Sequence, residues 1–266
     1  MQHYPDVYTM ITGASAGLGK EIALECARRG MNLILVALPG RNLQRLAHQL
    51  EMEFGIAVVV YETDLTQPGA VEALAAEVSA CYPVNWLVNN AGMGGTAAFL
   101  QTTPTFIDQV IQLNVRATAL LTRLMLPELL RHPHSYILNV SSVAAFSPMA
   151  YKTVYPATKA FVYAFSRGLR EELKNTAVSV SIVHPGPILT NFNTSRRIMA
   201  QGAFAKIGLL PASEIARIAI KETLNGREMI IPGIGNYVQA ALMRMIPETL
   251  RIRLLSNVFK REMTAA

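Results

Sequence analysis

The sequence predicts a doubly wound α/β fold, in which a parallel sheet carries helices on both faces. Short apolar runs alternate with longer amphipathic stretches, and several runs, such as LILVA, are continuously apolar. Continuous Val/Ile/Leu runs suit strands that are buried on both faces. Strand–helix–strand alternation implies right-handed crossovers between parallel strands. A chain of 266 residues with 51% apolar content can bury such a core.

The individual elements follow from this alternation. We expect seven strands, at residues 8–12, 32–37, 57–61, 86–89, 135–140, 178–183 and 229–231. Helical patterns lie between them, at residues 19–29, 42–54, 69–79, 105–131, 154–174 and 212–225. No linker or repeat interrupts the chain before residue 230. Residues 1–232 are therefore expected to form one domain, followed by a helical extension at residues 233–266.

Charge and cysteine content argue against several function classes. The net charge is +6, and residues 231–261 hold five basic residues against the single acid Glu248, so we expect no nucleic-acid partner. Cys26 and Cys81 are far apart and fit no metal or disulfide framework, which favours a reducing, cytoplasmic compartment. Residues 1–13 lack a basic segment followed by an apolar one, so we expect no signal peptide. No run reaches about 18 apolar residues, so we expect no spanning helix.

The turn TGASAGLG follows the first strand and opens the first helix. Its glycines let a pyrophosphate approach the backbone, and the helix N-terminus offers unpaired N–H groups and a positive dipole end. The spacing is G-x-x-x-G-x-G, not the commoner G-x-G-x-x-G. A purely structural turn is the alternative, but the strand–turn–helix context favours a dinucleotide. The predicted contacts are Gly13, Ser15, Gly17, Leu18 and Gly19.

Two polar motifs follow the third and fourth strands. Asp64 either accepts a hydrogen bond from an adenine amino group or serves as a turn or N-cap aspartate. In NNAG, Asn90 can tie strand ends together, and Ala91 and Gly92 can pass close to a ribose. Ligands of doubly wound sheets bind beyond the carboxyl ends of the strands. We therefore expect both motifs to line the same crevice as the glycine turn.

Tyr155 and Lys159 stand four residues apart in a predicted helix, and Ser142 lies before them. The spacing places the tyrosine and the lysine on one helix face. A lysine cation beside a phenol is expected to lower the phenol's pKa, which makes Tyr155 a usable proton donor or acceptor. The pattern Y-x-x-x-K also arises by chance on exposed helices, so its weight depends on the other motifs.

These motifs, taken in order, resemble the classical short-chain dehydrogenase/reductase family over about residues 8–231. TGASAGLG resembles the family's cofactor turn, Asp64 its adenine-binding acid and NNAG its fourth-strand motif. The resemblance implies a Rossmann-like fold, a nicotinamide dinucleotide cofactor and interconversion of a ketone and a secondary alcohol. In the segment PGPILT it implies contacts to the nicotinamide end by Pro185, Gly186, Ile188 and Thr190.

The resemblance also implies a catalytic tetrad of Asn114, Ser142, Tyr155 and Lys159. Ser142 would polarise the substrate carbonyl, and Tyr155 would give or take the proton. Lys159 would lower the pKa of Tyr155, and both residues would contact the bound cofactor, with Lys159 holding the nicotinamide ribose. Asn114, in the middle of the predicted helix at residues 105–131, would hold a water that connects Lys159 to solvent.

Four neighbouring side chains are alternatives to the tetrad. Ser141 is expected to point away from the site, because successive strand residues face opposite ways. Ser147 falls in a predicted loop. Tyr151 is expected to line the site without titrating. His184 could act as an acid or a base, but it ends an apolar strand, so we interpret it as a structural residue.

The predicted cofactor preference depends on the charged residues expected in the glycine turn and after the second strand. Family members that use NADP often carry basic residues at the positions that match Ala16 and Leu38, whereas members that use NAD carry an aspartate near Leu38. Neither pattern is present. No carboxylate would repel a 2′-phosphate, and Arg41, with Asn42 beside it, could approach one, so NADP(H) is favoured over NAD(H). The alternative is that Arg41 is an ordinary solvated loop residue.

The last third of the chain is expected to shape the substrate end. Residues 191–210 would form a substrate lid with apolar contacts. Residues 233–266 place apolar residues at helical spacing beside basic ones, which fits peripheral membrane contact, subunit contact or packing on the chain's own domain. We expect a cytoplasmic homodimer or homotetramer that reduces a moderately lipophilic ketone. The alternative from another class is a catalytically idle NAD(P)-binding redox sensor or scaffold.

Overall fold

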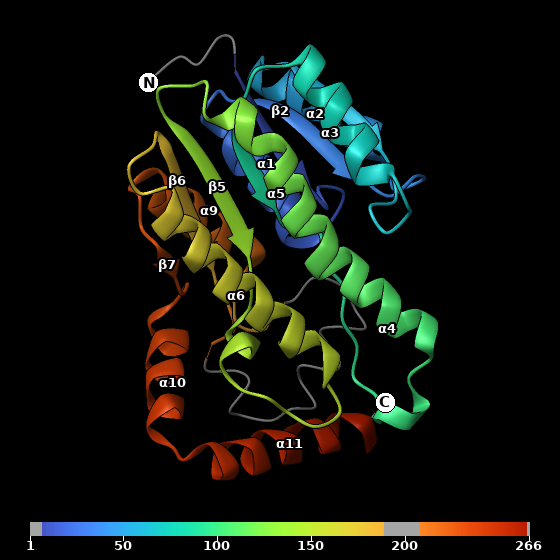
Figure 1. Cartoon of the computed structure of the whole chain (residues 1–266), viewed down its shortest axis with the longest axis vertical. Helices are drawn as coiled ribbons and strands as arrows, with labels where there is room; N and C mark the ends of the chain where they lie inside the picture. Colours follow the sequence, from blue (N-terminus) through green and yellow to red (C-terminus); the bar gives the residue numbers. More distant parts are fainter. Residues whose placement is uncertain (1–6, 189–207, 265–266) are drawn as a thin grey trace.

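The computed structural model describes residues 7–188 and 208–264, and a seven-stranded sheet forms its centre (Figure 1). The strand order is β3-β2-β1-β4-β5-β6-β7, and neighbouring strands are parallel throughout. The strands are β1 (Tyr8–Thr12), β2 (Asn32–Ala37), β3 (Val58–Glu62), β4 (Val84–Asn89), β5 (Ser135–Val140), β6 (Val178–Val183) and β7 (Met229–Ile230). The order reverses between β1 and β4, as in doubly wound sheets. The predicted fold class is confirmed.

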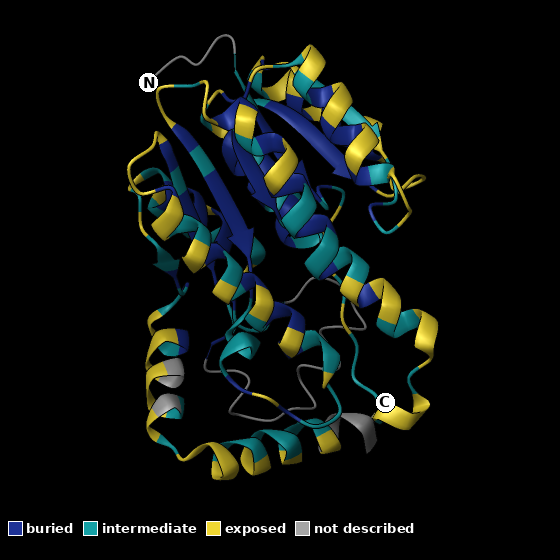
Figure 2. Cartoon of the chain, in the orientation of Figure 1, coloured by how far each residue is buried: buried dark blue, intermediate teal, exposed yellow. Residues whose placement is uncertain are grey.

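Helices cover both faces of this sheet (Figure 2). They are α1 (Gly17–Arg28), α2 (Leu43–Phe54), α3 (Ala70–Cys81), α4 (Pro104–Ile111), α5 (Thr118–Leu129), α6 (Val154–Glu172), α9 (Ala212–Leu224), α10 (Ile234–Met245) and α11 (Glu248–Thr264). Ile11 of β1 packs in the core beneath α1, α2 and α9, whereas its neighbour Met10 packs in the core beneath α3 and α5. Successive strand residues point to opposite faces, so a sheet covered on both sides needs apolar residues at both positions.

The predicted helix at residues 105–131 is divided in the structure. Between α4 and α5 lies η2 (Gln112–Ala117), a π-helical turn that places Asn114 in the interior. A π-turn adds one residue to the helical repeat and occurs frequently at functional sites. Its apolar pattern resembles that of a plain α-helix, so the sequence prediction missed it. The described residues also include two short 3₁₀ turns, η1 (Phe99–Gln101) and η3 (Val143–Phe146).

The C-terminal extension consists of α10 and α11, which lie along the lower edge of the molecule (Figure 1). Ser256 Oγ of α11 accepts a hydrogen bond of 2.9 Å from the backbone N–H of Ala150, and Lys152 Nζ lies 4.4 Å from the centroid of the Phe259 ring. The extension therefore packs on the chain's own domain beside the loop that precedes Tyr155. Its membrane and subunit contacts stay predictions. In the described part of the chain, no helix combines the length and apolar character that crossing a bilayer demands.

Candidate active site

The glycine turn lies at the carboxyl end of β1, where the strand order reverses. Gly13 and Gly17 have φ angles of 69° and 55°, in the left-handed region that glycine adopts without strain. Gly19 has no room for a Cβ, which would collide with the Gly13 carbonyl oxygen. Ala16 at the N-cap of α1 makes no side-chain cap. The first N–H groups of α1 are thus left for a ligand, and the turn fits the phosphates of a dinucleotide.

A second set of contacts joins the ends of β1 and β4. Thr12 Oγ1 accepts hydrogen bonds of 3.0 Å from the backbone N–H groups of both Asn90 and Ala91. Asn90 Nδ2 donates to the carbonyl oxygens of Thr12 (2.9 Å) and Gly13 (3.2 Å). Asn90 therefore ties the strand ends together, as expected. The part played by Thr12 was missed, although a polar residue at the end of an apolar strand is a signal for it.

Behind this junction lies a buried polar network that the sequence analysis also missed. Asn89 Nδ2 donates to Asn139 Oδ1 at 2.8 Å and to Thr122 Oγ1 at 2.9 Å. Asn139 Nδ2 in turn donates to Ser166 Oγ at 2.8 Å. The network links β4, β5, α5 and α6 directly beneath the site. Buried polar groups paired in this way hold one arrangement of the surrounding elements.

Asn114 is fully buried in the π-turn and connects two parts of the site. Its Oδ1 accepts from the Met93 N–H at 2.9 Å, and its Nδ2 donates to the Met93 carbonyl at 2.9 Å and to Thr158 Oγ1 at 3.0 Å. The amide is thus occupied by the segment after NNAG and by the neighbour of Lys159. The relay water assigned to Asn114 stays a prediction.

Ser142 and Tyr155 come together across the site. Ser142 is the N-cap of η3, its Oγ accepts from the Ala144 N–H at 3.2 Å, and its hydroxyl is close enough to the Tyr155 phenol to affect the pKa of that group. Burial raises the pKa of Tyr155 above its usual value, and the Ser142 hydroxyl opposes that rise. The expectation that Lys159 lowers the pKa of Tyr155 is therefore wrong for this arrangement. Desolvation by the surrounding protein, which a local sequence pattern does not reveal, sets the direction of the shift, and Lys159 is not among its causes.

Lys159 lies on the same face of α6 as Tyr155, and its ammonium group points into the interior. Its Nζ donates to the Val140 carbonyl at 2.8 Å and lies 5.9 Å from the centroid of the Tyr155 ring. Burial lowers the pKa of Lys159 to about 8. A Cβ added to Gly92 would come within 3.2 Å of this ammonium nitrogen. The segment after β4 therefore passes directly over Lys159.

Three of the competing residues differ from Ser142 in their surroundings. Ser141 Oγ donates to the carbonyl of Lys159 at 2.8 Å, so it braces the helix instead of facing Tyr155. Ser147 is buried at the end of η3. Tyr151 has a φ of 66°, an uncommon conformation for a tyrosine, in the loop ahead of α6. Gly94, which the sequence analysis did not single out, lies against the ring of Tyr155.

At the predicted adenine end of the site, the Asp64 carboxylate is bonded within its own turn. Asp64 Oδ1 accepts from the backbone N–H and hydroxyl of Thr66, and Oδ2 accepts from Gln67 Nε2 at 3.0 Å. These bonds lower the pKa of its carboxyl group against the opposing effect of burial. Asp64 is thus a turn aspartate, and its contact to adenine stays a prediction. Arg41 and Leu38 are both exposed in the loop after β2.

The segment after β6 closes the other side of the site. Pro185 is buried, Gly186 is partly buried, and Ile188 forms an isolated parallel bridge with Leu210. Asn236 of α10 approaches Gly186 so closely that a Cβ there would collide with its amide. Thr190 and most of the predicted lid at residues 191–210 lie outside the described residues.

The chain is similar in sequence to known proteins. The family model described as short chain dehydrogenase matches residues 8–201. The chain is 34% identical over 202 residues to "Probable oxidoreductase EphD" of Mycobacterium tuberculosis, covering 75% of this chain and 34% of that protein. It is 31% identical over 185 residues to human 17-beta-hydroxysteroid dehydrogenase type 3, covering 69% and 59%. The chain thus spans roughly a third to three fifths of the length of these curated relatives.

Solved structures match over nearly the full chain. A short-chain dehydrogenase from Sphingobium yanoikuyae in complex with NADPH has a TM-score of 0.77 at 30% identity, covering 91% of this chain and 97% of that one. The bulky-bulky ketone specific alcohol dehydrogenase from Comamonas testosteroni has a TM-score of 0.76 at 28% identity, covering 92% and 96%. With the family model matched over most of its length, this chain belongs to the classical short-chain dehydrogenase/reductase family of oxidoreductases.

Proposed function

We propose that the protein is an NADP(H)-dependent oxidoreductase that interconverts a ketone and a secondary alcohol. The observation that carries this proposal is the convergence of four residues, which are Asn114 of η2, Ser142 after β5, and Tyr155 and Lys159 of α6. When bound, the nicotinamide supplies hydride chemistry. The chain's own residues supply orientation, charge and the proton.

The cofactor contacts follow from the geometry of the turns. The glycine turn and the start of α1 would hold the pyrophosphate, and Asp64 would accept a bond from the adenine. Ala91, Gly92 and Lys159 would hold the nicotinamide ribose. The segment from Pro185 to Ile188, extended to Thr190, would contact the nicotinamide end.

Each catalytic side chain would act on the substrate oxygen or on its neighbour. Ser142 donates its hydroxyl hydrogen to the carbonyl oxygen and polarises it. Tyr155 gives its phenolic proton to that oxygen in reduction and removes it in oxidation. Lys159 lies beside this phenol, with its Nζ 5.9 Å from the centroid of the Tyr155 ring, and its ammonium group would hold the nicotinamide ribose. Asn114 holds the segment after β4 in place against Lys159.

The proposed substrate class follows from the names of the relatives. The comparison proteins include an enzyme named for bulky ketones and a hydroxysteroid dehydrogenase. We therefore propose a moderately lipophilic ketone as substrate. The test is a panel of ketones and alcohols read at nicotinamide absorbance with both cofactors. Tight cofactor binding without turnover across that panel would instead support an idle redox sensor or scaffold.

The preference for NADP(H) rests on Arg41, the exposed cation that follows β2 at a position where no carboxylate opposes a 2′-phosphate. Replacing Arg41 with Ala should raise the KM for NADPH about 10-fold and leave the KM for NADH unchanged, since a charged hydrogen bond contributes about 1.5–3 kcal/mol. An equal change in the KM for both cofactors, or no change in either, would refute the assignment of Arg41 to the 2′-phosphate.

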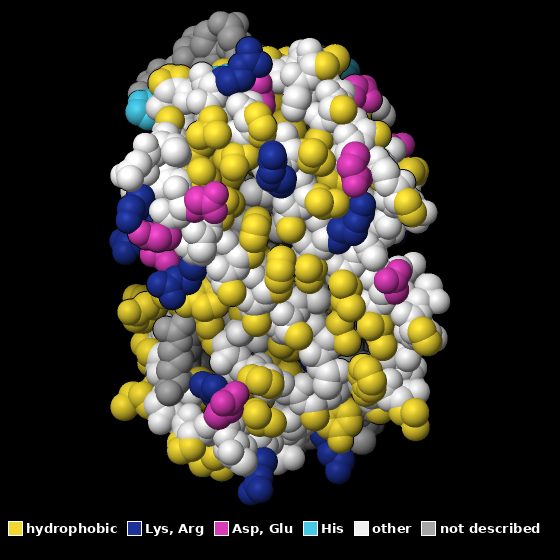
Figure 3. Space-filling view, viewed as in Figure 1, with side chains coloured by type: hydrophobic (Ala, Val, Ile, Leu, Met, Phe, Trp, Pro, Cys, Tyr) yellow, Lys and Arg dark blue, Asp and Glu magenta, His cyan; other side chains and the backbone are white. Residues whose placement is uncertain are grey.

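The oligomeric state is proposed from an apolar face. Ile111, Leu124 and Phe161 are exposed on α4, α5 and α6, and the rings of Phe161 and Phe165 stack at 5.7 Å. Figure 3 shows apolar side chains spread over this side of the molecule. Such a face fits a second copy of the chain, in a homodimer or homotetramer. A monomer by light scattering at micromolar concentration would refute this proposal.

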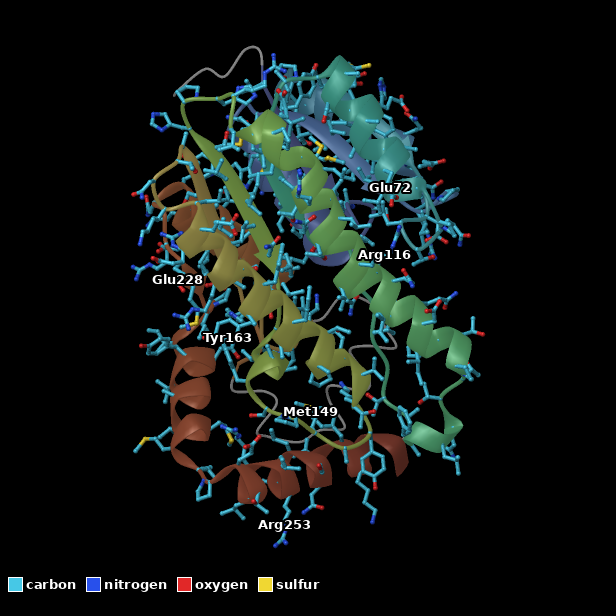
Figure 4. All side chains as sticks on the ribbon, viewed as in Figure 1. Glu72, Arg116, Met149, Tyr163, Glu228 and Arg253 are labelled. Carbon is cyan, nitrogen blue, oxygen red and sulfur yellow. The ribbon has the colours of Figure 1, made fainter. Side chains whose placement is uncertain are left out.

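The extension offers a separate surface. Ile234, Tyr237, Leu242 and Met245 are exposed along α10, and Arg253 points away from the body on α11 (Figure 4). An apolar stripe beside a cation fits peripheral contact with an anionic membrane. Co-sedimentation with anionic and zwitterionic vesicles tests this, and equal absence from both pellets would exclude it.

A further inference from the structure

His184, the residue after β6, is completely buried directly behind Ser142. Its Nδ1 lies 3.0 Å from the backbone carbonyl oxygen of Ser142, and its own backbone N–H donates to the Ile230 carbonyl at 2.8 Å. A carbonyl oxygen can only accept a hydrogen bond, so Nδ1 must carry the proton in this contact. The histidine thus acts as a donor to the peptide of the serine that polarises the substrate.

An aromatic cage fixes the orientation of this donor. The His184 ring lies 4.6 Å from the centroid of Phe146 and 5.3 Å from that of Tyr163, and these two rings lie 5.6 Å apart at 86°. Phe146 belongs to η3, whose N-cap is Ser142, and Tyr163 belongs to α6, which carries Tyr155 (Figure 4). The cage therefore joins the elements of both catalytic groups around one imidazole.

The side chain of His184 supplements the backbone hydrogen bonds around Ser142. The Ser141 N–H donates to the Val183 carbonyl at 2.9 Å, and the Val143 N–H donates to the Pro185 carbonyl at 3.1 Å. These bonds hold the residues on either side of Ser142. The Ser142 carbonyl between them accepts from the backbone N–H of Ala145 at 3.0 Å and from Nδ1 at 3.0 Å, so the imidazole adds a side-chain donor to a backbone one. Rotation of that peptide would move the Ser142 Oγ relative to Tyr155.

We propose that His184 is a positioning residue for Ser142, and that its Nδ1–H fixes the serine peptide so that the hydroxyl reaches both the substrate oxygen and Tyr155. This inference rests on the proposed function, in which Ser142 acts on the substrate. It assigns no proton transfer to the imidazole itself. The donor and the ring have separate tasks, since the donor orients Ser142 and the ring fills the cage.

Three substitutions separate the donor from the ring. His184→Asn places an amide N–H near the Nδ1 position without the ring, His184→Phe keeps a ring without a donor, and His184→Gln moves the amide to the Nε2 position. A misplacement of about 1 Å costs about 100-fold in rate, so we expect kcat to fall about 10- to 100-fold in the Phe and Gln variants. The Asn variant should keep kcat within about 3-fold of the native value. The cofactor dissociation constant should be unchanged in all three.

Thermal unfolding supplies the matched control. The Phe variant should keep the higher Tm because it fills the cage, although it has the lower kcat, whereas the Asn variant should show the reverse. If kcat instead follows Tm across the three variants, His184 has only a packing role and the inference is overturned.

A double-mutant cycle with Ser142→Ala tests the route of the effect. If His184 acts through Ser142, His184→Phe should cost less than about 2-fold further in the Ser142→Ala background, since effects on one unit are not additive. A full additional loss would overturn the inference. Undiminished turnover in Ser142→Ala alone would refute the proposed function instead.

A measurement without turnover tests the contact itself. In ¹⁵N-histidine-labelled protein, long-range ¹H–¹⁵N correlation spectra distinguish the two neutral tautomers, and the His184→Asn spectrum assigns the signal. We expect His184 to be in the Nδ1–H tautomer at neutral pH. The Nε2–H tautomer would overturn the inference whatever the variants show.

Discussion

Replacing Gly94 with Ala perturbs Tyr155 without touching its functional groups. The new Cβ would lie 2.5 Å from Cδ2 and 2.9 Å from Cγ of the Tyr155 ring. Carbon atoms in contact lie about 3.5–4.0 Å apart, so the ring or the loop must move by about 1 Å. A displacement of that size at a catalytic group costs about 100-fold. We therefore expect kcat of Gly94→Ala to fall about 100-fold.

The matched control is Gly168→Ala, which lies on the same helix as Tyr155. A Cβ at Gly168 meets no atom within 4 Å, so this variant should keep native kcat and gain up to about 1 kcal/mol of stability. The assay is steady-state reduction of the best ketone of the panel, with cofactor binding followed by nicotinamide fluorescence. Native kcat in Gly94→Ala, or a loss confined to cofactor binding, would refute the reasoning.

Two further predictions need no substrate. Burial lowers the pKa of Lys159 from 10.5 to about 8, so between these pH values the unfolded chain holds a proton there that the folded chain releases. The free energy of unfolding should therefore rise with pH across that window, relative to the Lys159→Met variant. Urea titrations of both proteins at pH 8 and pH 10 measure this difference. Asn236→Leu removes bonds of 2.8 Å to the carbonyls of Gly208 and Pro232 and should cost about 2–4 kcal/mol, whereas exposed Asn257→Leu should cost under about 0.5 kcal/mol. A flat pH response, or equal losses in the two asparagine variants, would contradict these expectations.

The elements most accurately predicted are those with the strongest local patterns. β1, β2, β5 and β6 begin and end at the predicted residues, because strands buried on both faces need unbroken apolar runs. The spacing of Tyr155 and Lys159 correctly predicted that they share a helix face, because the geometry of a helix depends only on local spacing. The glycine turn was identifiable because its residues have no substitutes in that backbone conformation.

What the sequence could not predict depends on contacts between distant segments. The raised pKa of Tyr155 comes from burial by several elements, whereas the sequence analysis weighed only Lys159. Gly94 gains its importance only when the segment after β4 is placed against α6. The π-turn around Asn114 is set by packing, because its apolar spacing allows a plain helix as well. Asn236 lies 50 residues from Gly186, and no motif joins them.

The central claim is that Tyr155 transfers the proton within a site whose cofactor contacts do not depend on its hydroxyl. The most direct test is the kcat of Tyr155→Phe with NADPH and the best ketone of the panel, measured beside its dissociation constant for NADPH. We predict that kcat falls about 10²- to 10⁴-fold, the range for loss of a general acid, while the dissociation constant changes less than about 3-fold. Undiminished turnover in Tyr155→Phe would contradict the claim.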